Sequence, residues 1–325
     1  MDDLSIQKQY RTDSNIIDNE RQGYLESLWS DNNPTSVLKF YKELRNVSEL
    51  VRFSTGRQKA EIKIIRRGNL KSNMKFIIPT MDHNSQQCKM LEENYKNYEV
   101  LFIESSGKLF NYAKSVNAGI SEVVGDGKSE IVIISNDDII MSPSGFQEIR
   151  NLTQTEQSVY CLKPEKQNYS GESLEIAVPS TWAKLYEGFK AARNGFRYQA
   201  DLISFLTRKK FNYARAFSRE FLSHNFLMIG SKSITGKFVN FADFGVFNIS
   251  ILRENRFDET FINGWEDWDL SYRLKQKGFN ILPLNISFVR NAHSSIGRVM
   301  SKESEVIHSY LNRIYFFEKH SKLKR

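Results

Sequence analysis

The sequence predicts an α/β protein with a mostly parallel central sheet flanked by helices, and three short apolar runs carry this prediction. KFIIPT (75–80), YEVLFIESSG (98–107) and EIVIISNDDIIM (130–141) are rich in β-branched residues and are ended or interrupted by polar, Pro or Gly residues. Stretches with helical spacing follow each run. Strands that alternate with helices imply right-handed crossovers and parallel pairing. Ligands bind such sheets beyond the carboxyl ends of the strands.

The remaining elements of the domain are predicted from spacing and caps. NYAKSVNAGISEVVG (111–125) has small and apolar residues at helical spacing, and SPSGFQEIRNL (142–152) starts with two serines that can cap a helix. FADFGVFNISILRENRFDETFINGWEDWDL (241–270) is predicted as strand, turn and helix. FNILPLNISFV (279–289) is predicted as a late strand.

Changes in composition divide the chain into a central domain and appended parts. Residues 1–70 are polar with helical spacing, which predicts a helical N-terminal extension. The α/β domain covers 71–300 and contains a helical insertion at 165–240, where basic and aromatic residues mix. This insertion either binds nucleic acid by stacking or covers the sheet and shapes one side of a cleft. Residues 301–325 are predicted to form a basic amphipathic helix that either lies on anionic lipid or packs on the domain.

The composition limits the environment and the partners. The net charge of +8 favours an anionic partner: a phosphorylated small molecule, an acidic membrane surface or nucleic acid. The two cysteines, Cys88 and Cys161, are far apart in sequence, which argues against a disulfide scaffold and a zinc site. The polar N-terminus does not resemble a signal peptide, and no apolar run reaches the ~20 residues of a membrane-spanning helix. We expect a cytoplasmic chain, with peripheral contact at the inner face of a membrane left open.

IISNDDII (133–140) places carboxylates after a predicted buried strand. Carboxylate oxygens suit Mg²⁺ or Mn²⁺, which use one or two protein carboxylates together with substrate phosphates. The alternative is that Asn136 and Asp138 only form an Asx turn or cap a helix. The chain has neither the glycine-rich P-loop nor the GxGxxG fingerprint. A bound diphosphate would therefore need a metal ion for neutralisation, which favours the metal interpretation.

NGWEDWDLSYRLKQKGF (263–279) crowds acids and tryptophans at a predicted helix start. Apolar walls raise the pKa of a carboxyl group and make it a better base, while the helix N-terminus opposes that shift. Glu266 and Asp267, between the two tryptophans, are therefore candidates for chemistry. Asp269 and Arg273 are four residues apart, which predicts a structural ion pair on the surface.

These pieces resemble, in their order, the family-two glycosyltransferases of GT-A fold, which are inverting sugar transferases. FIIPT, VLFIESSG, NYAKSVNAGI and IVIISNDDIIMSPSGF are similar to the first two strands of that family, the helix that follows, and the strand with the DxD motif. The most specific match is FGVFNISILRENRFDETFINGWEDWDLSYRLKQKGFNI (244–281), which resembles the acceptor-side signature. NAHSSIGR (291–298) lies where the family often has a late histidine. The resemblance covers about 75–160 and 241–298.

The resemblance implies roles for the matched residues on the acceptor side. Asp267 would be the catalytic base, and Glu266 would contact or orient the acceptor. Trp265, Trp268 and Gly245 would line the acceptor site, where tryptophan faces can stack on a sugar. The alternative for Trp268 is that it is simply a core residue.

The resemblance also implies a metal site and a donor pocket. Asp138 would be the principal ligand of a divalent cation, Mn²⁺ or Mg²⁺, with Asn136 and His293 as further ligands. His293 has an alternative interpretation as an ordinary loop histidine. The implied donor-binding residues lie at strand ends and on the helix after the second strand: Pro79, Thr80, Asp82, Glu104, Lys114, Asn117, Asn136 and Asp137.

Several positions depart from the family pattern. Asn136 replaces the first Asp of the DxD motif, Glu104 stands where aspartate is usual, and Asp82 stands where asparagine is common. These differences bear on metal affinity and donor identity. The QxxRW motif of processive synthases is missing, so transfer of one sugar is expected rather than polymerisation.

The expected function is that of a glycosyltransferase (EC 2.4 class) in glycan or polysaccharide biosynthesis. It would move one sugar from a nucleotide-sugar to a glycan, lipid-linked or protein acceptor, with the metal offsetting charge on the leaving diphosphate. Two alternatives stay open. A sugar nucleotidyltransferase shares the sheet and the metal, but usually has an early glycine-rich loop with lysine that is absent around 79–85. A non-catalytic carbohydrate- or nucleic-acid-binding protein would have no use for a base beside a metal.

Overall fold

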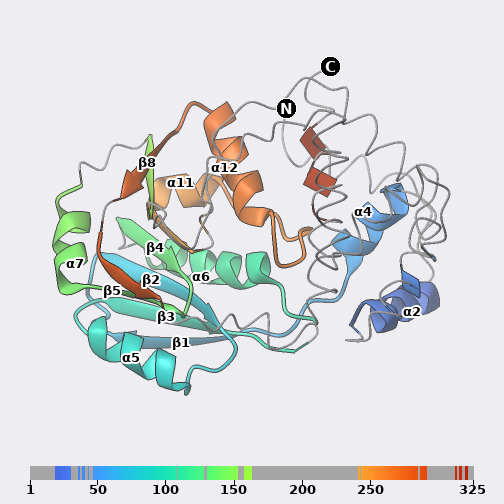
Figure 1. The fold of residues 1–325 in the computed structure, drawn as a ribbon, viewed down its shortest axis with the longest axis horizontal. Helices are drawn as coiled ribbons and strands as arrows, with labels where there is room; N and C mark the ends of the chain where they lie inside the picture. The colour runs from blue at the N-terminus through green and yellow to red at the C-terminus, as the bar shows by residue number, and fades with distance from the viewer. Residues whose placement is uncertain are drawn as a thin grey trace, which may run out of the picture.

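The computed structural model describes residues 19–30, 36, 39–40, 43, 47–107, 109–127, 130–152, 157–162, 241, 243–284, 286–290, 312, 315–316 and 319–320. These residues form one seven-stranded sheet with helices on both faces and a separate two-stranded sheet (Figure 1). The predicted insertion (165–240) and His293 lie outside the described residues. Among the described helices, none is long and apolar enough to cross a bilayer.

The seven-stranded sheet is mixed, and most of its strands run in one direction. Its spatial order is β1-β3-β2-β4-β7-β6-β8. The pairs β2–β3, β2–β4 and β6–β8 are parallel, while β7 is antiparallel to both β4 and β6, and β1 is antiparallel to β3. Five strands therefore share one direction and only β1 and β7 oppose it, as the α/β prediction required. The bounds are β1 Lys63–Gly68, β2 Met74–Thr80, β3 Glu99–Glu104, β4 Ile131–Ser135, β6 Ser158–Leu162, β7 Phe244–Asn248 and β8 Asn280–Leu284.

The predicted strand 75–80 is confirmed as β2, which is buried along its whole length. Its side chains alternate between two cores, because successive residues of a strand point to opposite faces. Phe76 and Ile78 pack with α5 (Gln86–Asn94) and α7 (Pro143–Arg150). Ile77 packs on the other face with α6 (Tyr112–Asp126), α11 (Ile249–Glu254) and α12 (Glu266–Gln276). This double burial explains the unbroken apolar run in the sequence.

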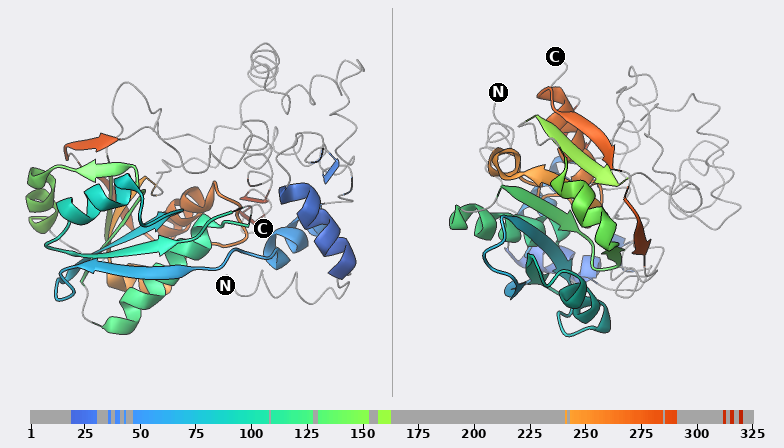
Figure 2. Two further views of the ribbon diagram at one scale, coloured as in Figure 1. Left: turned by 90° about the horizontal axis from the view of Figure 1, so that it is seen from below. Right: turned by 90° about the vertical axis from the view of Figure 1, so that its left-hand side faces the viewer.

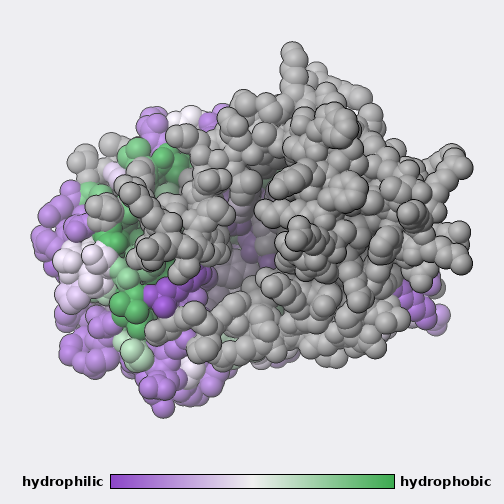
Figure 3. Space-filling view, viewed as in Figure 1, coloured by the Kyte–Doolittle hydropathy of each residue, from purple (hydrophilic) through white to green (hydrophobic). Residues whose placement is uncertain are grey.

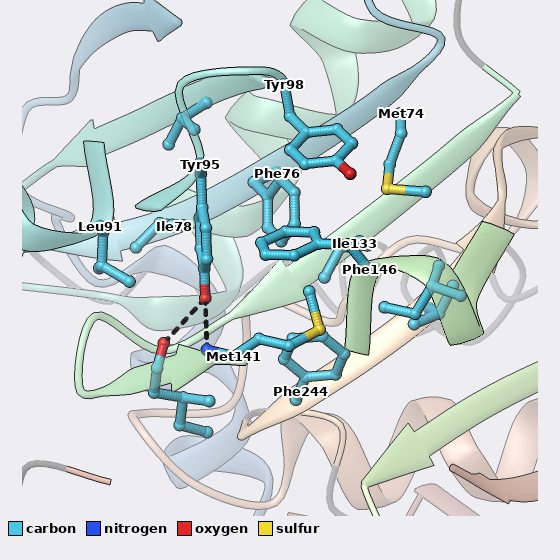
Figure 4. Close-up of a cluster of buried hydrophobic side chains, with 14 of the residues drawn as sticks. Met74, Phe76, Ile78, Leu91, Tyr95, Tyr98, Ile133, Met141, Phe146 and Phe244 are labelled. Carbon is cyan, nitrogen blue, oxygen red and sulfur yellow. Dashed lines mark hydrogen bonds between the residues drawn. The ribbon is translucent and has the colours of Figure 1, made fainter. Parts of the chain in front are cut away.

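Tyr95 links the first core to the segment that carries Asn136, Asp137 and Asp138, which together are called the acidic motif below. Its ring stacks on Phe76, with ring centroids 4.4 Å apart, and lies edge-on to Phe146 (Figure 4). Its hydroxyl donates to the Ile139 carbonyl (3.2 Å) and accepts from the Met141 amide (3.0 Å). The short strand β5 (Ile139–Met141), directly after the motif, is thereby fixed to the core.

Two predicted strands are each divided in the structure. The run 130–141 forms β4 and β5, because the chain turns at its polar break and β5 leaves the main sheet. The late strand 279–289 forms β8 and β9 (Phe288–Arg290), and β5 pairs with β9 in an antiparallel ladder. Leu282 of β8 and Val289 of β9 are 39% and 62% exposed. Figure 3 shows hydrophobic areas among hydrophilic ones on the face that it displays.

The N-terminal part differs from the prediction at its boundary. Helices α2 (Asn19–Ser30) and α4 (Val47–Gly56) agree with a helical extension, but β1 lies inside 1–70 and joins the main sheet. β1 is half polar and only six residues long, so it gave no clear strand pattern. Lys63 pairs with Glu104, which places the start of β1 at the carboxyl end of β3. Figure 2 shows α2 and α4 beyond this end of the sheet.

At Gly119, helix α6 approaches the sheet closely, and a larger side chain there should lower the stability of the fold. A Cβ at Gly119 would lie 2.5 Å from Ile77 Cγ2 and 3.1 Å from Ile103 Cδ1. Overpacking costs about 1–3 kcal/mol, whereas alanine gains at most about 1 kcal/mol in helix propensity. G119A should therefore lower the melting temperature. G125A, on the same helix with no atom within 4 Å of the added Cβ, should raise it slightly. A higher melting temperature for G119A would contradict this account of the contact.

Candidate functional site

The carboxyl ends of β2 and β4 are joined by a buried hydrogen bond. Thr80, the last residue of β2, donates from Oγ1 to Asp137 Oδ2 at 2.8 Å. Asn136 contacts the residue that precedes β7: its amide N–H donates to the Asp243 carbonyl at 3.1 Å, and its side-chain amide donates to Asp243 Oδ1 at 3.3 Å. The acidic motif therefore lies across three neighbouring strands at the edge where ligands bind in such sheets.

Asp138, the predicted metal ligand, pairs with an arginine from β9. Arg290 stands opposite Ile139 in the β5–β9 ladder, and its Nε donates to Asp138 Oδ2 at 3.2 Å. Its second contact is from Nη2 to Asp243 Oδ1 at 2.7 Å. The other oxygen of Asp138, Oδ1, is buried and has no hydrogen-bond partner among the described residues. A buried carboxylate oxygen without a partner is unusual and indicates a position for a further ligand or cation.

The second part of the site is the start of α12, where Glu266 and Asp267 are both buried. The loop before it is strained, because Asn263 (φ 50°) and Trp265 (φ 73°) adopt left-handed backbone conformations. The Asn263 side chain fixes this loop to α6: Oδ1 accepts from the Tyr112 amide at 2.9 Å, and Nδ2 donates to the Phe110 carbonyl at 3.1 Å. The predicted helix and its acidic start are thus confirmed. The loop before the helix is held in a backbone conformation that residues other than glycine disfavour.

The two tryptophans of this stretch are half-buried, and their ring centroids lie 5.3 Å apart. Trp265 also packs against Phe316 near the C-terminus, at 5.5 Å between centroids. The tryptophans are therefore neither fully buried core residues nor free surface residues. Each keeps part of its surface accessible beside a buried carboxyl group.

Burial changes the acidity of both carboxyl groups. It raises the pKa of Glu266 to about 7, although a hydrogen bond from the Gly264 amide to Oε2 (2.6 Å) opposes the shift. Burial, followed by the charge of Glu266, raises the pKa of Asp267 well above its usual range. Of the two opposed effects expected at this helix start, burial dominates, and the net shift is upward. At neutral pH the two groups compete for protons, so their titrations are linked.

Asp243 connects the two parts of the site electrostatically. The negative charge of Asp138 is among the causes that raise the pKa of Asp243, after burial. The charge of Asp243 in turn contributes to the raised pKa of Asp267. The buried hydroxyl of Tyr112 has its pKa raised first by burial and then by four carboxyl groups, those of Glu266, Asp267, Asp243 and Asp137. The acidic motif after β4 and the start of α12 therefore lie close enough for their charges to act on one another.

Residues near the C-terminus hold the loop that precedes α12. The Asn312 side chain accepts from the Ile262 amide at 2.9 Å and donates to the Ile262 carbonyl at 2.8 Å. Tyr315 donates from its hydroxyl to Asp258 Oδ2 at 2.8 Å. Of the predicted C-terminal helix, the described residues are helical, and all five are buried. This agrees with packing on the domain rather than a position on lipid.

The surface ion pair predicted for Asp269 is in fact buried. Arg273 Nε donates to Asp269 Oδ2 at 2.7 Å, as expected, but the Asp269 side chain is 0% exposed. Lys319 Nζ lies 3.0 Å from Asp269 Oδ1, and His320 Nε2 lies 2.8 Å from the same oxygen. Burial acts to raise the pKa of Asp269, but these partners hold it well below its usual range. The sequence did not show this because the cations come from a distant segment.

A third group of residues lies at the ends of β2 and β3. Glu104 accepts hydrogen bonds from the His83 amide (3.0 Å) and from the His83 ring, which together lower its pKa. Asp82 Oδ1 accepts from the Asn84 amide at 2.8 Å. Within the described part of the chain, Asp82, His83 and Glu104 form the one group of three acidic or histidine ligands close enough to share a metal, with ligand atoms within 4.8 Å. The predicted metal position at Asp138 is a different one.

Other predicted donor- and acceptor-side residues have structural contacts. Lys114 Nζ donates to the Ala60 carbonyl at 2.8 Å. Asn117 accepts from the Phe257 amide at 3.0 Å and donates to the Phe257 carbonyl at 2.8 Å, which fixes the loop before α12 to α6. Gly245 pairs with Ile134 inside the sheet, and an added Cβ would lie 2.5 Å from the Phe247 ring. Pro79 pairs with Ile103.

Three site residues were not predicted from the sequence. Asp243 lies in FADFG, and an acid between phenylalanines just before a strand is a signal like that of Asp267 between tryptophans. Tyr112 lies near the start of a predicted helix, where nothing singled it out. Arg290 gave no signal, because it enters the site only through the β5–β9 pairing.

Comparisons with known proteins add no assignment. A scan against protein-family models finds no match, and a search of curated proteins finds none. The geometry of the site and the sequence resemblance are therefore the basis for a functional proposal.

Lys319 provides a test of the support beneath α12. K319M should lower the free energy of unfolding by about 3–5 kcal/mol, because it leaves Asp258 and Asp269 buried with one cation fewer. Lys319 Nζ lies 2.9 Å from Asp258 Oδ2 in addition to its contact with Asp269. The control is K96M, which removes the exposed pair with Glu93 and should cost less than about 1 kcal/mol. Equal midpoints of denaturant unfolding for the two variants would contradict the buried network.

Proposed function

We propose that this chain is an inverting glycosyltransferase of GT-A fold, which transfers one sugar from a nucleotide-sugar to a hydroxyl group of a glycan, lipid-linked or protein acceptor. The observation that supports this most is the electrostatic connection of Asp138 to Asp267 through Asp243. The reaction needs positive charge where the diphosphate leaves and a base where the acceptor attacks. In this proposal Asp138 holds the positive charge, and Asp267 is the base.

The acceptor side of the proposed reaction needs a group that takes a proton. Asp267 Oδ2 is buried and has no hydrogen-bond partner among the described residues, so it is available to a substrate hydroxyl. Its raised pKa makes the carboxylate a stronger base than a solvated aspartate. Glu266, fixed by the Gly264 amide, keeps its charge beside Asp267 or holds the shared proton. Trp265 and Trp268 are half-buried, and an acceptor sugar would stack on the part of their surface that stays accessible.

The donor side needs an acidic residue that can hold a divalent cation. Oδ1 of Asp138, buried and without a hydrogen-bond partner in the described part of the chain, fits a ligand of Mg²⁺ or Mn²⁺. Asp243 shares Arg290 with Asp138 and accepts from Asn136. The Asn136 side chain is turned to Asp243, so Asp138 would be the main protein ligand, which is a usual arrangement when phosphates complete the coordination. A cation bound there would offset negative charge on the leaving diphosphate. Thr80 positions Asp137 at the same edge.

The nucleotide of the donor would bind beyond the ends of β2 and β3. Asp82, His83 and Glu104 gather there, and Glu104 is held by two hydrogen bonds from His83. A carboxylate fixed in this way can accept from the N–H groups of a base or the hydroxyls of a ribose. In this proposal Lys114 and Asn117 act indirectly, since they fix segments around α6 rather than present free side chains.

The variant D267N tests the proposed base. It keeps the size of the side chain but removes its basicity, so sugar transfer should fall by about 10²–10⁴-fold. Binding of nucleoside diphosphate in the presence of Mn²⁺, measured by calorimetry, should stay within about twofold of wild type. The control E254Q changes an exposed acid on α11 and should leave both quantities unchanged. An active D267N enzyme would remove Asp267 from this role, and nucleotide binding without any transfer to any acceptor would favour a binding protein.

The pH dependence of transfer tests the same residue independently. The base is active only when deprotonated, so activity should be lost as the pH falls through its pKa. Because burial and the charge of Glu266 raise the pKa of Asp267 well above its usual range, the acid limb of kcat/KM should have its midpoint well above the value of about 4 that is typical of aspartate. E266Q removes a neighbouring charge and should move this midpoint to lower pH. A limb near pH 4 in the wild type would contradict the assignment.

A further inference from the structure

Arg290 occupies the position where the proposed divalent cation would act. Its guanidinium contacts Asp138 Oδ2 at 3.2 Å and Asp243 Oδ1 at 2.7 Å, and its side chain is 32% exposed. Asp138 and Asp243 are much more buried, with side chains 8% and 16% exposed. The arginine therefore covers two inward carboxylates from the solvent side. The ladder between β5 and β9 keeps its main chain opposite Ile139, so only the side chain can move away.

Arg290 contacts only one of the two carboxylate oxygens of Asp138. Glu266 and Asp267 have raised pKa values, so they take up protons more readily than solvated carboxyl groups. Asp137, Asp138 and Asp243 remain at the motif, and among these Asp137 is hydrogen-bonded by Thr80. Oδ1 of Asp138 stays buried without a partner among the described residues, while Arg290 takes Oδ2. The site thus retains a place for more positive charge, directly beside a positive charge that is already present.

We propose that Arg290 is a tethered cation that competes with a divalent metal ion for Asp138 and Asp243, and that its guanidinium binds the diphosphate of the donor once the metal has displaced it. A metal ion on Asp138 and a guanidinium on the same carboxylate repel each other at such short distance. A planar guanidinium also matches phosphate oxygens as well as carboxylate oxygens. A diphosphate bound beside the metal would therefore offer the displaced guanidinium phosphate oxygens in place of the two carboxylates.

This arrangement predicts a coupling between the two ligands. The metal alone binds weakly, because it must break two contacts of Arg290. A diphosphate receives the released guanidinium and raises the affinity for the metal, and by linkage the metal raises the affinity for the diphosphate to the same extent. The competition for Asp138 follows from the contacts of Arg290, while the diphosphate as second ligand rests on the proposed function.

The competition is tested by titrating Mn²⁺ into the full chain without nucleotide and measuring free Mn²⁺ by electron paramagnetic resonance. R290Q should bind Mn²⁺ roughly tenfold more tightly than wild type, within the range typical of coupled sites. The gain should vanish in R290Q/D138N, which separates this site from Asp82, His83 and Glu104. R253Q removes an exposed arginine of α11 and should match wild type. Equal or weaker binding by R290Q would overturn the proposal.

R290K is a second variant for the case that R290Q does not fold. Lysine retains one positive charge but cannot hold both carboxylates in the same fork geometry. R290K should bind Mn²⁺ with an affinity between those of wild type and R290Q. If R290Q is folded and both variants bind Mn²⁺ with the affinity of wild type, competition is excluded. Melting temperatures of all variants identify any that are not folded.

The coupling is tested by repeating the Mn²⁺ titrations with each common nucleoside diphosphate at saturation. In wild type the affinity for Mn²⁺ should rise by roughly tenfold with the diphosphate that binds, and in R290Q this rise should fall to about twofold or less. An undiminished rise in R290Q would overturn the role of Arg290 on the diphosphate. If no nucleoside diphosphate binds, the proposed function fails, while the titration without nucleotide still decides the competition.

Discussion

The candidate site depends on the mutual repulsion of carboxyl groups that are buried at one edge of the sheet. Glu266, Asp267, Asp243 and Asp137 all act to raise the pKa of the buried Tyr112 hydroxyl, and Asp138 acts on Asp243. In a medium of low polarity such groups stay together only if they hold protons, pair with cations or bind a metal. Within the described residues, raised pKa values at the start of α12 favour the first means, and Arg290 provides the second at the acidic motif. The third would be provided by a bound cation in the proposed reaction.

The surrounding fold restrains the elements that carry these charges. Tyr95 fixes β5 directly after the motif, and Asn263 fixes the strained loop before α12 to the start of α6. Below α12, Asp258 and Asp269 are also buried, but Lys319 and Arg273 give them cationic partners, and His320 lies 2.8 Å from Asp269 Oδ1. Helix α12 therefore carries acids with opposite shifts in pKa: that of Asp269 is lowered, and those of Glu266 and Asp267 are raised. On this helix Asp269 serves the fold, while Glu266 and Asp267 are the acids proposed for chemistry.

The sequence analysis succeeded where a local pattern has a single physical cause. The buried run 75–80, the helix 111–125 and the acidic start of α12 depend on burial, spacing and caps within a few residues, and all three were predicted. The same reasoning named the two opposed effects on the pKa of Asp267 and left their balance to the structure. It failed for β1 and for the division of 130–141 into β4 and β5, because those depend on pairing partners far away in sequence.

The sequence by itself therefore determined the α/β class, the strands with polar carboxyl ends and the residues that local context makes unusual. Only the tertiary structure decided which charges meet. It buried the Asp269–Arg273 pair beneath residues near the C-terminus, gave Lys114 and Asn117 contacts to main-chain segments, and brought Arg290 onto Asp138 and Asp243. The physical reason is that burial and ion pairing depend on distances between segments, and a distance that arises from folding leaves no trace in the spacing of residues along the chain.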